Sequence, residues 1–128
     1  MSMLAETLEN SKFLVSLYGP DFSFSDVDLQ EIRLGWDGPI AHIVFSLSAF
    51  PVKPPEKWRG LNAVQVELSL FPLHDVAVTK FARGNKCSID IEHLPDGLYN
   101  VLISGESTAS AKVASVSVDK VSAYLRGS

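Results

Sequence analysis

The sequence predicts an α+β domain that is mainly antiparallel β, in which an N-terminal helix packs on a curved sheet or sandwich of about seven strands. Two observations favour this class. The apolar residues have helical spacing near the N-terminus and alternate with a period of two afterwards. The connections between alternating runs are too short for the crossover that parallel strands need. At a length of 128 residues, we expect the whole chain, 1–128, to form a single domain.

An apolar stripe with helical spacing runs from Leu4 to Tyr18. Asn10 or Ser11 can cap a separate second helix within this stretch, because either side chain can accept a hydrogen bond from an unpaired amide. Gly19 and the proline that follows it are expected to end the helix, since glycine turns easily and proline cannot continue a helix.

The rest of the chain reads as strands. The first runs from Val27 to Trp36, and its apolar positions change parity near Gln30-Glu31, which predicts a β-bulge. The turn Pro95-Asp96-Gly97 predicts a hairpin. The last run changes parity near Ala114-Ser115, which predicts a second bulge. The other strands are expected within residues 40–50, 64–70, 76–82 (ending at the turn Arg83-Gly84-Asn85), 87–92, 98–104 and 109–125.

Charge and targeting signals exclude several classes of protein. The chain has 11 basic and 15 acidic residues, and residues 1–40 hold seven acids against two bases, a net charge of −5 for that third. This acidity disfavours nucleic-acid binding and suits a basic protein partner. The sequence has no run of ~20 apolar residues and no basic, apolar secretory signal at its start. We therefore expect a cytoplasmic protein with neither nucleic-acid nor membrane partners.

The residues that carry chemistry in enzymes form no recognisable constellation. Cys87 is the only cysteine, and it shares the apolar parity of Ile89, which predicts a buried and unreactive thiol. The three histidines, His42, His74 and His93, lack the spacing of metal ligands. We expect a protein that is not an enzyme and has no cofactor or metal.

Two pairs of residues are compatible with a weaker alternative, in which the protein is a hydrolase. His74-Asp75 resembles half of an acid–base pair, and Asp90 and Glu92 lie two apart, so on a strand they face the same side. A solvated strand face explains such acids equally well and is commoner. A further alternative is a small β-rich module that binds a hydrophobic ligand or a peptide, because the second face of residues 40–50 mixes apolar and polar side chains.

Acids near the N-terminus and one tryptophan are the candidate partner-binding residues. Asp26 and Asp28 are two apart and therefore project from the same side of a strand. Trp58 lies in a proline-rich loop, where it either closes one end of the sheet or anchors a partner, and Trp36 beside a turn is open to both interpretations. The predicted contact set is Asp21, Asp26, Asp28, Glu31 and Trp58.

The arrangement of these segments resembles the immunity protein 50 family. The helix end Leu17-Tyr18-Gly19-Pro20 and the following residues 21–27 are similar to that family's entry motif, although Ser25 stands where the family has a histidine. Residues 34–39, 58–71 and 74–76 also fit, so the resemblance covers nearly the whole chain. It implies a non-enzymatic, cytoplasmic antidote of a bacterial polymorphic-toxin or contact-dependent inhibition system. Such a protein binds and neutralises a cognate toxin domain by direct contact.

Overall fold

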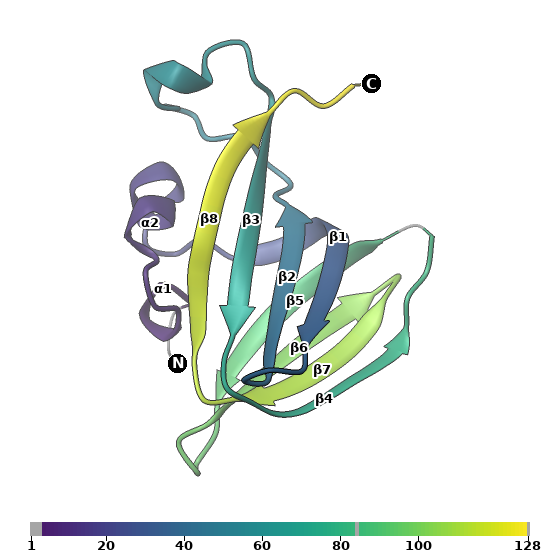
Figure 1. The fold of residues 1–128 in the computed structure, drawn as a ribbon. Coiled ribbons are helices and arrows are strands. Elements are labelled where there is room, and N and C mark those ends of the chain that lie inside the picture. Colours follow the sequence, from purple (N-terminus) through teal and green to yellow (C-terminus); the bar gives the residue numbers. More distant parts are fainter. Residues whose placement is uncertain (1–3, 84, 128) are drawn as a thin grey trace.

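The computed structural model describes residues 4–83 and 85–127, and it confirms a mainly antiparallel α+β fold (Figure 1). Within these described residues, two short helices precede a single open sheet of eight strands in the order β4-β7-β6-β5-β1-β2-β3-β8. The helices are α1 (Leu4–Thr7) and α2 (Lys12–Tyr18), and the strands are β1 (Phe24–Gly35), β2 (Ile40–Ser46), β3 (Ala63–Leu70), β4 (Leu73–Lys80), β5 (Lys86–His93), β6 (Tyr99–Gly105), β7 (Thr108–Val113) and β8 (Val116–Tyr124).

The sheet curves so that its two halves share one hydrophobic core (Figure 1). The first half consists of β1, β2, β3 and β8, and the second of β5, β6, β7 and β4. Alternation in each strand sends one set of side chains inward, and Phe45, Leu68 and Val113 are fully buried there. The opposite face of the first half is polar, and we call it the outer face.

The last predicted run is two strands and not one strand with a bulge. β7 pairs with β6 and β4 in the second half, whereas β8 pairs with β3 in the first half. The chain crosses between the halves at Ala114-Ser115, beside the crossing from β3 to β4, since the amide of Phe71 donates to the carbonyl of Ser115 at 3.1 Å. The parity change that predicted a bulge therefore marks this crossing, and the sheet has eight strands.

Most other local predictions are confirmed. The register of β1 against β2 shifts between Leu29 and Glu31, where the bulge was expected. The Pro95–Gly97 turn joins β5 to β6. The two helices are separate, and the second ends at Gly19 with φ 90°. The predicted side-chain cap is wrong: Ser11 precedes the helix without a capping hydrogen bond from its side chain, and its hydroxyl donates to the carbonyl of Ala5 instead. Gly84 of the predicted 83–85 turn lies outside the described residues.

The segment between the helices lies along β8, an edge strand of the sheet. Glu9 forms an isolated parallel bridge with Ser117, in which its amide donates to Val116 and its carbonyl accepts from Val118, both at 2.9 Å. The side-chain amide of Asn10 donates to the carbonyl of Val118 at 3.0 Å. None of the helices in the described ranges is long and apolar enough to cross a membrane.

Candidate functional site

Asp28 forms ion pairs with two basic residues of its own chain. Its carboxylate lies 2.7 Å from Nη1 of Arg126 and 3.2 Å from Nζ of Lys86. Partial burial raises the pKa of Asp28, but the hydrogen bonds from Arg126 and Lys86 outweigh it and hold the pKa below its usual 3.8. The carboxylate is therefore charged and already neutralised by two cations.

The other three acids of the predicted set differ from one another. Glu31 lies 2.5 Å from Nη1 of Arg33, with both side chains about half exposed. Asp21 and Asp26 are exposed, and neither forms an ion pair among the described residues. Asp26 lies at the register shift between β1 and β5, with φ 55°. Of the four acids, Asp21 and Asp26 thus carry exposed negative charge that no basic side chain of the described residues neutralises.

Trp58 belongs to the core. It ends a short 3-10 turn, Glu56–Trp58, and is 5% exposed. Its ring packs edge-on against Phe13 at 5.7 Å between centroids and lies 6.2 Å from Phe50. The buried ring closes one end of the sheet, so in this structure it is not available as a surface anchor.

The exposed tryptophan is Trp36, which the predicted contact set omits. It lies in the turn between β1 and β2 and is 96% exposed. Leu34 and Phe71 nearby are 54% and 45% exposed. We call Leu34, Trp36, Pro39 and Phe71 the Trp36 patch. A cleft of about 310 Å³ opens beside it, lined in part by Trp36, Leu73 and His74.

The turn that carries Trp36 is firmly held. The amide of Leu73 donates to the carbonyl of Pro39 at 3.0 Å, which ties the turn to the start of β4. Gly38 lies on the ring of Phe71, where a Cβ atom would come 2.9 Å from Cε1, and its φ of 130° favours glycine. The backbone of this turn is therefore anchored to the start of β4 and packs against Phe71, beside the exposed indole of Trp36.

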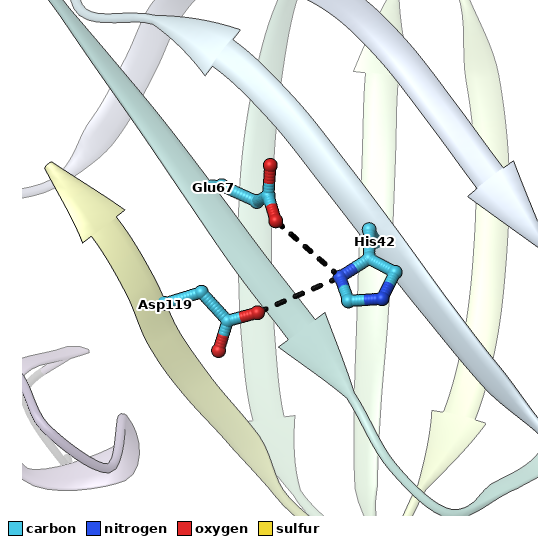
Figure 2. A group of neighbouring side chains, drawn as sticks. All are labelled: His42, Glu67 and Asp119. Atoms are coloured by element: carbon cyan, nitrogen blue, oxygen red, sulfur yellow. Dashed lines mark ion pairs between the residues drawn. The ribbon is translucent and has the colours of Figure 1, made fainter. Parts of the chain in front are cut away.

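A polar cluster lies on the outer face, where β2, β3 and β8 are neighbours (Figure 2). Nδ1 of His42 is 3.6 Å from Oε2 of Glu67 and 3.5 Å from Oδ2 of Asp119. The hydroxyl of Ser69 donates to the carboxylate of Asp119 and lies 3.2 Å from Nδ1 of His42. Spacing along the chain did not reveal this cluster, because strand pairing assembles it.

The predicted hydrolytic pairs stay apart from any such cluster. Asp90 and Glu92 are exposed on β5, and no ion pair engages them in the part of the chain that the structure describes. His74 and Asp75 begin β4 and line the cleft beside Trp36 without a mutual hydrogen bond among the described contacts. Cys87 is 3% exposed, as its parity predicted.

The cavity that the described residues enclose between the two halves of the sheet is too small for a ligand. The space there measures about 20 Å³, lined by apolar side chains such as Ile43, Val101 and Ala111. Such a volume holds about one water molecule. On the other face of β2, Val44 pairs with Glu31 and Glu67 on either side and is 7% exposed. The apolar residue Val44 on this mixed face is thus covered by the side chains of the neighbouring strands.

Comparison with known proteins identifies a family. A family model described as immunity protein 50 matches residues 10–124. No curated protein and no solved structure matches the chain. Immunity proteins neutralise toxins as inhibitors and are typically not enzymes, so the expectation of a non-enzymatic protein is confirmed. Because the match spans nearly all of its 128 residues, the chain belongs to the immunity protein 50 family.

Proposed function

We propose that this protein neutralises a cognate bacterial toxin domain in the cytoplasm by direct protein–protein contact, and that the Trp36 patch is the centre of that contact. The 96% exposure of Trp36 is the observation that carries the proposal. A lone protein gains nothing from an indole in water, whereas tryptophan is among the residues that dominate binding energy at interfaces.

The backbone contacts of the turn support the same role. Pro39 is hydrogen-bonded to Leu73, and Gly38 rests on Phe71, so the turn keeps its shape before a partner arrives. An anchor that is already ordered loses little conformational entropy on binding. The adjacent cleft of about 310 Å³ offers room for a side chain from the partner.

Charge around the patch indicates the chemistry of the partner. Asp37 follows Trp36 directly, and Asp75 lines the cleft, so acids flank the apolar centre. A basic toxin surface with an apolar pocket would complement this arrangement. We propose that Asp21 and Asp26 add to the field that attracts such a surface, and that the ion-paired Asp28 and Glu31 contribute less.

Capture from the native bacterium tests the proposal. Tagged wild-type protein should recover one near-stoichiometric partner with a toxin-like C-terminal domain, identified by mass spectrometry. Against that partner, Trp36→Ala should weaken binding by at least ~30-fold, as expected for an interface anchor. Phe81→Ala is the matched control, because Phe81 is also an exposed aromatic residue (54%) but follows the far end of β4.

Two results would contradict parts of the proposal. Recovery of the protein alone, under conditions that preserve a nanomolar complex, would argue against toxin binding. Unchanged affinity for Trp36→Ala would move the contact away from the Trp36 patch. Charge reversal of Asp21 and Asp26, which form no ion pair among the described residues, then shows whether the N-terminal acids take part, through a loss of affinity or a slower association rate.

A further inference from the structure

We propose that His42, Glu67 and Asp119 bind a divalent transition-metal ion, with zinc as the expected ion. The site lies on the outer face of the sheet, on strands β2, β3 and β8 (Figure 2). It is independent of the Trp36 patch and of the identity of the toxin.

Two of the three separations between the donor atoms fit a metal better than they fit hydrogen bonds. Nδ1 of His42 lies 3.5 and 3.6 Å from the two carboxylate oxygens, and all three atoms are within 4.8 Å of one another. Hydrogen bonds of this type are about 2.7–3.2 Å long, so His42 makes none to either acid, and its polar partner at that distance is the hydroxyl of Ser69, at 3.2 Å. A tetrahedral zinc ion with bonds of about 2.0–2.1 Å holds its ligand atoms about 3.4 Å apart, which matches the two separations from His42.

The donor set also suits such an ion. Imidazole with two carboxylates is typical of zinc and its neighbours, whereas magnesium and calcium prefer oxygen ligands alone. The side chains of His42 and Glu67 are 21% and 17% exposed, so they are partly shielded but remain open to an ion from solvent. Three protein ligands leave a fourth position for water.

Alternation along β8 places Asp119 on this face with Ser117, and a bulge follows directly. Val118 pairs with Leu68 and Lys120 pairs with Glu67, which leaves Asp119 as the extra residue of the edge strand. The hydroxyl of Ser69 donates to Asp119 and fixes its carboxylate, the kind of outer-shell contact that orients metal ligands. Ser69 is therefore a positioning residue in this site.

One neighbouring cation, Arg33, contacts a proposed ligand atom. Nη2 of Arg33 lies 3.4 Å from Oε2 of Glu67, the oxygen that also faces His42. Arg33 has a closer partner in Glu31, at 2.5 Å, and can stay there when a metal takes Glu67. Lys120 is exposed and makes no ion pair among the described residues.

Binding would join three adjacent strands, including an edge strand, by one ion. The protein contains 3 histidines, which makes the test clean, because His74 and His93 serve as controls. Untagged, chelator-treated protein is titrated with zinc chloride by calorimetry, and its thermal unfolding is followed in parallel. We expect one ion per chain with micromolar affinity and a Tm raised by about 4 °C or more at saturation.

Substitution of the proposed ligands, with the other two histidines as controls, tests where the zinc ion binds. His42→Gln and Asp119→Asn should each weaken zinc binding by at least ~50-fold, and His74→Gln and His93→Gln should leave it unchanged. Absence of zinc binding up to about 100 µM overturns the proposal, and so does full binding by His42→Gln and Asp119→Asn. Equal affinity for magnesium also overturns it, because an imidazole ligand disfavours magnesium. Cobalt added to wild-type protein gives an independent readout, since a tetrahedral site produces strong visible absorption.

Discussion

Asp28 shows how a single carboxylate links distant parts of the chain. It joins Lys86 on β5 to Arg126 beyond β8, and the pKa of Asp28 is lowered because these hydrogen bonds outweigh the effect of burial. A lowered folded-state pKa stabilises the protein above the unfolded value of about 3.9, and this contribution is lost as pH falls through the folded value.

We therefore expect Asp28→Asn to lower the free energy of unfolding by about 0.5–1 kcal/mol at pH 7 and by a smaller amount at pH 3, because the contribution shrinks as pH falls below the unfolded value of about 3.9. Urea denaturation at the two pH values measures the difference. Asp90→Asn is the control, because Asp90 is exposed without an ion pair among the described residues. An equal loss at both pH values would show that the ion pairs are not its cause.

The two tryptophans give the second prediction at this scale. Trp58→Ala should cost about 3–5 kcal/mol of unfolding free energy, because a buried ring leaves a cavity behind. Trp36→Ala should change stability by less than about 0.5 kcal/mol, because its ring lies in water. Chemical denaturation of both variants checks this contrast. A large loss from Trp36→Ala would mean that its ring supports the fold.

At the scale of elements, the pairing of β5 with β6 depends on Gly105. Its φ is 134°, and a Cβ atom there would collide with the backbone carbonyl of Lys86 and lie 2.9 Å from Cα of Cys87. Gly105→Ala should destabilise the protein by about 2 kcal/mol or more, since backbone cannot move aside cheaply. Gly97→Ala is the matched control, with a positive φ of 87° but no atom within 4 Å. Urea denaturation should give a clearly smaller loss for the control.

A change in the parity of apolar positions predicts a β-bulge correctly only where nothing else produces the same change. The shift from Leu29 to Ile32 indicated the bulge in β1 correctly. At Ala114-Ser115 the same parity shift arises because the chain crosses from one half of the sheet to the other. The sequence alone does not distinguish such a crossing from a bulge. The bulge at Asp119 also left a signal, because the inward valines Val118 and Val121 are three residues apart instead of two.

At the scale of the whole molecule, the order in which the strands pair could not be predicted from the sequence. β3 pairs with β8 and β1 with β5, so residues far apart in sequence, such as Leu70 and Val116, are partners. Sequence alternation predicts which face of a strand is apolar but not which strand lies beside it. His42, Glu67 and Asp119 come together only through this pairing, and the exposure of Trp36 likewise depends on which turn meets which end of the sheet.

Both edges of the sheet are interrupted. On β8, Glu9 occupies backbone groups beside Ser117, and Asp119 forms a bulge. On β4, the register shifts between Leu73 and Asp75 and again between Val78 and Lys80. We expect the isolated protein to stay monomeric at concentrations near 1 mM, because neither edge offers a regular row of free amides. Light scattering after size-exclusion chromatography measures this, and a concentration-dependent dimer would contradict it.

The Glu9 bridge also limits how two copies of this chain can meet. An open sheet edge is a template on which a second copy can pair, and repeated pairing leads to aggregation. Glu9 occupies backbone groups of Val116 and Val118, so this stretch of β8 is not free to pair with another sheet. The small bridge at Ser117 thus works against self-assembly of the chain.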